Sequence, residues 1–331
     1  MSEKFIYISR IEIKNLWHRF DIAWDLNPDV NVLSGINGSG KSTILNAISQ
    51  LIINYNTPDK LDNIQQDINI FLSDNTSVGL QFIDARNSLH RHLLTDKMNK
   101  LGKFNREIIT THSLDDYKVV LFSNEYDMSI KTSNGSKKFY DLFLLDYINT
   151  FDNQLKKLDD SSRLSNENVL TELDWQIFLL MNKYLSYQLS ISKKLTTDVE
   201  ANKYHNKFLE ILNSLFQETG KWLNQDKNEI SFLSGGEEIA PYQLSSGEKQ
   251  MLVILLTVLI QDCKPAVLFL DEPEISLHFD WQKKLIQYIR ELNPNVQVIL
   301  ATHSPAVIME GWVDKVSEVR DLITLDRKAA N

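Results

Sequence analysis

Residues 35–42 read GINGSGKS, and they are the strongest indication of the fold class in this sequence. Its spacing fits the pattern G-x-x-x-x-G-K-[ST]. The apolar run Val30–Leu33 before it reads as a short buried strand, and Ser42–Ile53 after it reads as an apolar helix. In such a strand–loop–helix unit, backbone N–H groups turn inward and the helix N-terminus faces the same place, so that together they hold a phosphate. These surroundings favour a phosphate loop over a chance glycine turn, and they indicate an α/β fold.

The side chains of this loop predict how it would hold ATP. Lys41 is expected to reach the β- and γ-phosphates, and the Ser42 hydroxyl is expected to bind Mg²⁺. We therefore expect ATP and Mg²⁺ as the ligands of this site. The residues of the loop predicted to bind ATP are Asn37, Gly38, Ser39, Gly40, Lys41, Ser42 and Thr43.

The second half of the chain supplies a pair of acids after an apolar strand. Residues 267–272 read VLFLDE, which places Asp271 and Glu272 at the C-terminal end of a buried strand, where open α/β sheets bind their ligands. Asp271 is suited to holding the magnesium through water, and Glu272 to orienting or deprotonating the attacking water. The alternative is a solvated acidic turn, which the fully apolar strand disfavours.

A histidine stands at the end of the next strand. Residues 296–301 read VQVILA and are followed by THS, with His303 in the middle. A neutral imidazole there can hydrogen-bond a γ-phosphate at the same edge of the sheet. A lone histidine is more often structural, but this position favours a catalytic role for His303 together with Glu272 and Lys41.

Two similar serine-glycine strings compete for a second phosphate contact. Residues 233–237 read LSGGE and lie between two short strand-like segments, which is typical of a hairpin. Residues 244–248 read LSSGE and lead into the apolar run Met251–Ile260. Because the second string opens a helix, Ser245 and Gly247 can direct a hydroxyl and backbone N–H groups at an anion. We therefore assign a turn to the first string and a ligand contact to the second.

Taken in their order along the chain (GINGSGKS at 35–42, LSSGE at 244–248, DE at 271–272 and THS at 302–304), these four motifs resemble those of ABC-class ATPases. The opening IEIKNL at residues 11–16 and the string EPEISLH at residues 272–278 make the chain similar to soluble heads of the SMC, RecF and overcoming-lysogeny type rather than to transporter subunits. The resemblance covers residues 5–55 and 228–310. Four motifs in order make it specific.

The resemblance implies a P-loop NTPase of ABC ATPase-head type, with a mixed β-sheet lobe and a helical lobe. It also implies a homo-oligomer in which two heads meet head to tail, so that ATP at Lys41 of one protomer is capped by Ser245 of the other. The sequence departs from the family in three places. Ser246 stands where many members have glycine. The glutamine loop cannot be placed, because its one weak candidate, Gln81, fits an ordinary strand residue better. Residues 275–278 (ISLH) keep the position of the family's D-loop but not a strict sequence.

The sequence suggests three parts. Residues 1–135 form an N-terminal lobe with the phosphate loop, residues 136–227 a helical insertion, and residues 228–331 a C-terminal lobe with the other three motifs. The insertion is expected to be helical because residues 136–219 contain neither glycine nor proline. A heptad-like seam within it indicates one buried helix face, with a short coiled coil as the alternative. The seam consists of Leu173, Ile177, Leu180, Tyr184, Tyr187 and Ile191.

Charge and composition exclude several roles. The chain has 331 residues, a formal net charge of −9 and one cysteine, Cys263. Overall charge therefore argues against coating nucleic acid, although residues 86–106, with six Arg or Lys and one Asp, fit either a local DNA contact or a solvated helix face. The longest apolar run, Met251–Ile260, is far shorter than the ~20 residues that a bilayer needs. With no secretory signal at the N-terminus, we expect a cytoplasmic protein without a membrane partner.

The sequence leaves three functions open. Only residues 304–331 follow the histidine, too few for a nuclease domain, so we expect a separate effector, with a nuclease as the candidate. Here the chain resembles ATPase subunits of bacterial antiphage systems such as Septu and PARIS. The alternatives are a RecF- or SMC-like repair head that clamps DNA directly and a transporter ATPase subunit. We expect the effector to dock on residues 136–219 through aromatic anchors. These are Trp175, Tyr184, Tyr187 and, just beyond the segment, Trp222.

Overall fold

The chain folds into two compact units. The first consists of residues 1–147 and 315–331, and the second of residues 148–314. Each unit has its own strands and helices. The structure is a computed structural model that describes residues 5–53, 67–74, 77–84, 108–114, 117–123, 144–149, 169–194 and 202–327.

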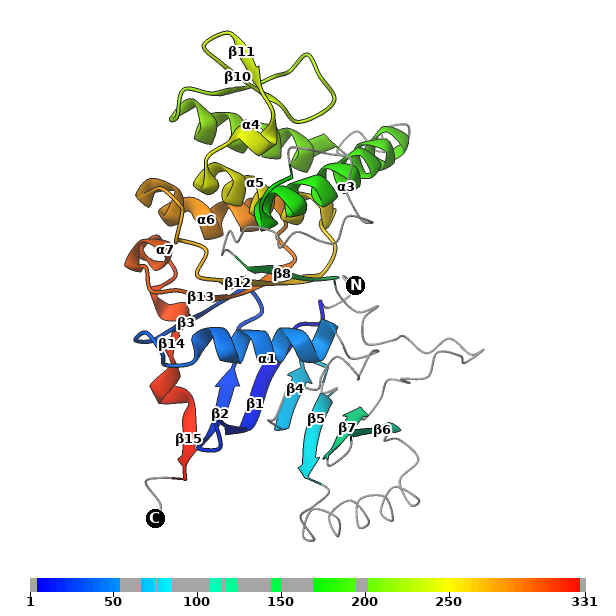
Figure 1. The fold of residues 1–331 in the computed structure, drawn as a ribbon, viewed down its shortest axis with the longest axis vertical. Coiled ribbons are helices and arrows are strands. Elements are labelled where there is room, and N and C mark those ends of the chain that lie inside the picture. Colours follow the sequence, from blue (N-terminus) through cyan, green and yellow to red (C-terminus); the bar gives the residue numbers. More distant parts are fainter. Residues whose placement is uncertain are drawn as a thin grey trace. The chain divides into compact units, whose positions relative to one another are not determined.

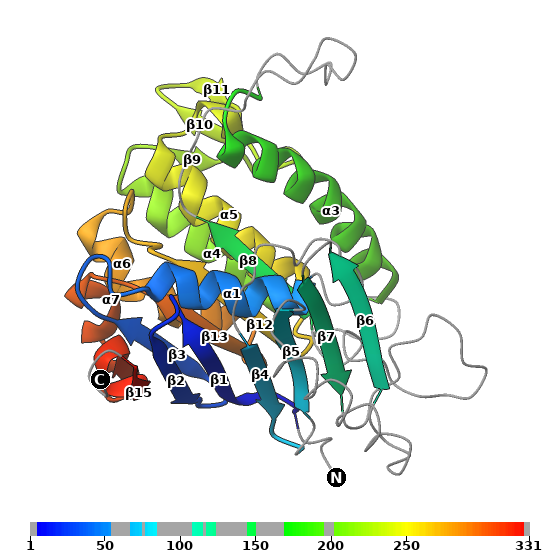
Figure 2. The ribbon, with the colours of Figure 1, turned by 60° about the horizontal axis from the view of Figure 1, so that its bottom comes forward.

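The first unit is built on a seven-stranded sheet. Its strands run in the order β15-β2-β1-β4-β5-β7-β6, and all neighbours pair antiparallel. Figure 2 shows most of these strands side by side. The strands are β1 (Ile8–Leu16), β2 (Phe20–Asp25), β4 (Asp67–Leu72), β5 (Ser77–Asp84), β6 (Ile108–Leu114), β7 (Tyr117–Ser123) and β15 (Ile323–Asp326).

Helix α1 (Lys41–Ile53) packs on this sheet (Figure 1). Ile44 and Ile48 lie one helical turn apart and are fully buried. On β4, Ile68 and Ile70 are buried at alternate positions, as expected for a strand with one covered face. The helix is therefore fixed by its apolar side, which also fixes the glycine loop that leads into it.

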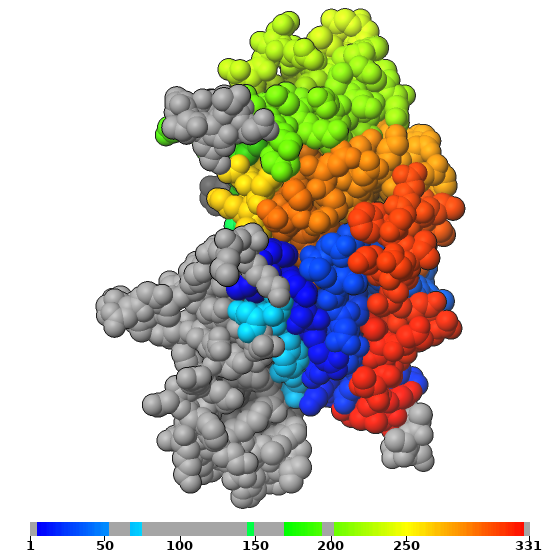
Figure 3. Space-filling model, turned by 180° about the vertical axis from the view of Figure 1, so that it is seen from behind, coloured from blue at the N-terminus to red at the C-terminus, as the bar shows by residue number. Residues whose placement is uncertain are grey.

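The last residues of the chain belong to the first unit. β14 (Val316–Glu318) pairs in parallel with β3 (Val30–Ser34), and β15 pairs with β2. Arg19 donates two hydrogen bonds to the carboxylate of Asp326, of 2.9 and 2.7 Å. Figure 3 shows this segment, in red, against the blue N-terminal strands. Residues 315–331 thus fold with the N-terminal unit, although the division expected from the sequence counts them with the C-terminal lobe.

The second unit combines a parallel strand pair with helices. Every residue of β12 (Ala266–Asp271) and β13 (Val296–Ala301) is buried, as is almost all of the apolar helix α5 (Ser246–Ile260). The other helices are α3 (Glu172–Lys194), α4 (Lys203–Gln217), α6 (Phe279–Leu292) and α7 (Pro305–Met309). A small antiparallel sheet has the order β11-β10-β9, with β9 (Trp222–Leu223), β10 (Phe232–Ser234) and β11 (Glu237–Ile239).

The heptad-like seam in α3 is a buried helix face, as predicted. All six of its residues are buried, and α3 packs on α5. Tyr184 is 2% exposed and Tyr187 is 6% exposed, so neither is an anchor on the surface. Of the four aromatic residues expected to meet an effector, Trp222 is the one that is largely exposed.

The helical character expected for residues 136–219 is wrong near its start. Residues 144–149 (LLDYIN) form a strand, β8. The absence of glycine and proline allows an apolar strand as readily as a helix, so this signal could not decide between them. The segment 150–168 and the basic stretch 86–106 lie outside the described residues.

The fold class predicted from the sequence, α/β, is confirmed by the combination of parallel and antiparallel strands with helices. Within the described ranges, none of the helices has the length and hydropathy needed to span a membrane.

Deleting residues 316–331 should destabilise the first unit. The deletion removes β14 and β15 and leaves β2, still paired with β1, as an edge strand with one open side, which invites aggregation. We expect a lower melting temperature and loss of soluble protein, whereas deleting residues 328–331 alone should change neither. Equal melting temperatures for the two truncated proteins would show that the returning strands contribute no stability.

Candidate functional site

Glycines shape the loop between β3 and α1. Gly38 and Gly40 have φ angles of 78° and 100°, in the left-handed region that other residues enter only with strain. Lys41 begins α1, and its side chain is buried, with Nζ donating to the Gly35 carbonyl at 3.2 Å. The ammonium group is therefore held against the loop, where a phosphate on the loop would meet it.

Two features of the loop fit a phosphate ligand. The Ser39 hydroxyl oxygen is buried and has no hydrogen-bond partner among the described residues. Asn37 and Gly38 are exposed, so the outer side of the loop is accessible. With the start of α1 behind it, the loop offers backbone donors and a cation to an anion, and Ser42 offers a hydroxyl to Mg²⁺.

An aromatic residue that the sequence patterns do not single out lies on this loop. A side chain at Gly40 would collide with the ring of Trp17. Trp17 lies in the β1–β2 turn, where Asn15, Trp17 and His18 all have positive φ. The turn thus places an indole ring against the loop at Gly40, where the φ of 100° also favours glycine. The string NLWHRF carries no periodicity that could have revealed this contact.

The acid and the histidine of the second unit meet at the ends of two parallel strands. The register of β12 and β13 pairs Asp271 with Ala301, so Glu272 and His303 follow at the same edge. His303 Nε2 lies 3.3 Å from Glu272 Oε1. The structure therefore brings together the two residues that the sequence assigned to catalysis in this half of the chain.

Glu272 has a strained backbone. Its φ is 48°, unusual for a residue with a side chain, and its N–H donates to the Ala301 carbonyl at 2.9 Å. Strain of this kind persists only where the surrounding structure fixes it, and it gathers at functional sites. The Glu272 side chain is 22% exposed, so solvent reaches it.

Glu274, within the string EPEISLH, and Gln282, outside the motifs, fix this edge. Glu274 Oε1 accepts hydrogen bonds from the backbone N–H groups of His303 (2.8 Å) and Ser304 (3.2 Å). Gln282 Nε2 donates to the Leu277 carbonyl at 2.9 Å, and its Oε1 accepts from the Ser304 hydroxyl at 2.6 Å. The loop after the acids is therefore tied to the loop that carries the histidine. Sequence reasoning missed Gln282, because a glutamine in an amphipathic helix carries no signal.

The second serine string caps α5. Ser245 is the N-cap, and its hydroxyl accepts from the Glu248 N–H, while its own N–H donates to Glu248 Oε2 at 2.9 Å. This is a capping box. Ser245 and Ser246 are exposed, whereas Gly247 is buried against the backbone carbonyl of Ser276. The string thus presents a serine and a helix N-terminus to the surface, as an anion site requires.

The first serine string is a hairpin turn, as predicted. β10 and β11 pair antiparallel from Phe232–Ile239 to Ser234–Glu237. Gly235 and Gly236 in the turn have φ angles of 60° and 87°. The Ser234 hydroxyl donates to the Gly220 carbonyl at 3.3 Å, so it is used within the fold.

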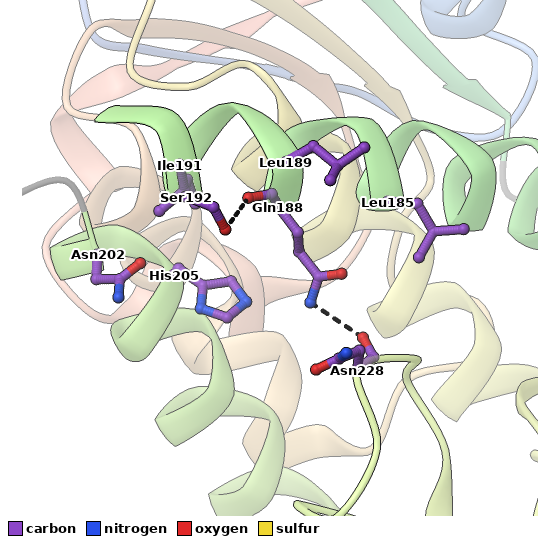
Figure 4. A pocket seen from close by; sticks show the side chains of 8 residues that line it. All are labelled: Leu185, Gln188, Leu189, Ile191, Ser192, Asn202, His205 and Asn228. Carbon is purple, nitrogen blue, oxygen red and sulfur yellow. Dashed lines mark hydrogen bonds between the residues drawn. The ribbon is translucent and has the colours of Figure 1, made fainter. Parts of the chain in front are cut away.

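A hollow of about 530 Å³ lies among α3, α4 and the loop before β10 (Figure 4). Gln188 Nε2 crosses it to donate to the Asn228 carbonyl at 3.0 Å. Burial lowers the pKa of His205 on its wall, so this imidazole is neutral at pH 7. None of the residues predicted to bind ATP lines this hollow, which separates it from the candidate site.

Two family models match the chain. The family described as "AAA domain, putative AbiEii toxin, Type IV TA system" matches residues 144–310, half of the chain. The "P-loop containing region of AAA domain" matches residues 8–59. The two matches cover both groups of predicted site residues.

Relatives agree with these matches. "Retron Vc95 probable ATPase" of Vibrio cholerae is 27% identical over 28% of this chain, which spans only 20% of that relative's length. The Septu protein PtuA of Bacillus thuringiensis is 21% identical to this chain, and the match covers 94% of this chain and 75% of PtuA. Among solved structures, an SMC head bound to a domain of ScpA covers 92% of this chain and 91% of its own, with 16% identity and a TM-score of 0.48.

Gly247→Ala should damage the second serine string. The added methyl group would meet the backbone carbonyl of Ser276, which cannot rotate away. We expect a loss of roughly 1–3 kcal/mol in the free energy of unfolding, measured by denaturant titration. Ser246→Ala, at the exposed neighbouring position, is the control and should stay within about 0.5 kcal/mol. A Gly247→Ala protein as stable as the wild type would contradict this packing.

Proposed function

The chain belongs to the AAA-domain family described as "AAA domain, putative AbiEii toxin, Type IV TA system", and we propose that it is an ATPase whose heads pair around ATP and control a separate effector in antiphage defence. The observation that carries the ATPase assignment is the pair formed by Glu272 and His303 at the ends of two buried parallel strands. Lys41 and the glycine loop supply the phosphate site that hydrolysis requires.

Glu272 is the general base of the proposed reaction. Its strained backbone and its place at the strand end hold the carboxylate where it can orient a water molecule and accept its proton. His303, within reach of the same carboxylate, can bind a phosphate oxygen with its imidazole. Lys41 balances the negative charge on the phosphates.

The magnesium site is assigned to two residues. The Ser42 hydroxyl would ligate Mg²⁺ directly, and Asp271 would hold it through water. The ion neutralises charge on the phosphate oxygens, which is its usual part in phosphoryl transfer. Asp271 is 4% exposed and ends a fully buried strand, which suits a fixed carboxylate rather than a mobile surface acid.

Pairing of two heads is supported by the position of Ser245. Its exposure at the N-terminus of α5 leaves the serine and the helix end accessible to a γ-phosphate held by another protomer. In the pair that we propose, each ATP lies between the glycine loop of one chain and Ser245 of the other. Two identical sites then form, related by a two-fold axis.

The role in defence is supported by the relatives. The match to Septu PtuA extends over nearly the whole chain, and a retron ATPase matches part of it. We propose that the effector is a separate protein, with a nuclease as the candidate class. We still propose that the effector docks on residues 136–219, next to the exposed Trp222. The buried Tyr184 and Tyr187 are no longer among the anchors.

Glu272→Gln should bind ATP but hydrolyse it about 100-fold or more slowly, because the amide keeps the shape of the acid and loses its basicity. With ATP and Mg²⁺ the variant should accumulate as a dimer. Phosphate release and gel filtration measure the two effects. A variant that runs as the apo protein does under these conditions would speak against pairing around ATP.

Matched substitutions distinguish the roles of the two serine strings. Ser245→Arg should abolish turnover and pairing while ATP binding to the glycine loop persists, because the serine acts on the partner's nucleotide. Ser234→Arg, on the hairpin, should reduce turnover far less. Equal loss of turnover in both folded variants would remove the distinction between the strings.

A further inference from the structure

The turn that follows α4 forms side-chain hydrogen bonds to both α5 and α6. Residues 218–221 follow α4, and Gly220, with a φ of 73°, allows the Lys221 N–H to donate back to the Phe216 carbonyl at 2.9 Å. Glu218 accepts from Trp281 Nε1 in α6 at 2.7 Å. The same turn reaches the start of α5 through Glu248.

Glu248 is a buried carboxylate shared between this turn and the serine string. It is 2% exposed. Its Oε1 accepts from Thr219 Oγ1 at 2.6 Å and from Lys221 Nζ at 2.8 Å. Its Oε2 accepts from the Ser245 N–H and from the Ser245 hydroxyl, both at 2.9 Å. One oxygen therefore faces the turn, and the other faces Ser245.

The charge of Glu248 depends on these partners. Burial raises the pKa of its carboxyl group, but the hydrogen bonds from Lys221, Thr219 and Ser245 outweigh burial and lower the pKa overall. The group is therefore ionised at neutral pH. Without Lys221, a negative charge would remain in a buried place with no cation beside it.

The Ser245 hydroxyl donates its single proton to Glu248 here, so it must turn from this carboxylate before it can donate to a phosphate oxygen. The turn after α4 holds the carboxylate from its other side and shares its charge. We propose that Lys221 and Thr219 are positioning residues that set the orientation of Ser245 through Glu248. This inference rests on the proposed function, in which Ser245 acts on the γ-phosphate of a partner chain. The end of α4 then determines whether the serine string is ready to receive ATP.

Lys227 provides a matched control. It forms a similar pair with Glu238, at 2.7 Å, but both of these side chains are about half exposed. In contrast, the Lys221 side chain is 19% exposed and that of Glu248 only 2%. An exposed pair contributes little, so Lys227→Met should leave turnover unchanged.

Lys221→Met should lower kcat about 10- to 100-fold, the loss expected for a hydrogen bond to a charged group. ATP binding to the glycine loop should be unchanged, as measured by equilibrium dialysis. Lys221→Arg, which keeps the charge, should recover most of the turnover. If Lys221→Met turns over ATP as fast as Lys227→Met does, the inference is wrong.

Mixing variants tests whether Lys221 acts through the partner's site. Equal amounts of Lys41→Met chains, which should be inactive alone, and Lys221→Met chains, which should be strongly impaired alone, form mixed pairs with one intact glycine loop facing one intact serine string. ATPase activity should return in the mixture. A Lys221→Met chain that is merely misfolded, or impaired in its own ATP site, would not complement.

A second mixture, of Lys41→Met and Ser245→Arg chains, tests the proposed pairing around ATP independently of the role of Lys221. If both mixtures recover activity, the positioning role is supported. If only the Ser245→Arg mixture recovers, the pairing around ATP stands and the role of Lys221 is overturned. If neither recovers, the proposed pairing fails, and the inference fails with it.

Discussion

Parallel pairing of β12 and β13 is the constraint on which the candidate catalytic edge depends. Because each residue from Ala266 to Asp271 faces its counterpart from Val296 to Ala301, the two strands end at the same level. Glu272 and His303 then follow directly and lie 3.3 Å apart. A slip of one residue in either strand would exchange the faces of its side chains and separate them. The buried apolar strands thus determine the geometry of two polar groups.

A second anchor is the apolar helix α5. Its residues from Met251 to Leu259 are buried, so the helix cannot shift along its axis without exposing apolar surface. Its N-terminus therefore stays at a defined place, where Ser245 caps it and Gly247 touches the loop after the acids. In this unit the serine string and the acid loop are held against each other by backbone contact rather than by flexible side chains.

The sequence predicts those parts of the site in which chemistry and chain pattern coincide. The glycine loop, the acids after VLFL and the hairpin around Gly235-Gly236 could all be recognised, because each requires particular residues at fixed spacing. Glu248 could have been found as well, since Ser245 and Glu248 have the spacing of a capping box. Trp17 and Gln282 could not, because their contacts depend on tertiary packing. Strand β8 was also missed, because its sequence LLDYIN has no pattern that distinguishes a strand from a helix.

In the proposed pair, Ser245 of one chain meets the nucleotide bound to the glycine loop of another. The most direct test is nucleotide-dependent cross-linking in a Cys263→Ser background, between one chain with Ile36→Cys and a second, differently tagged chain with Ser246→Cys. Both positions are exposed, Ile36 by 82%. A short bismaleimide should join the two chains when Mg²⁺ and a non-hydrolysable ATP analogue are present, and not with ADP or without nucleotide. No inter-chain product with the analogue, or the same yield without it, would contradict the account.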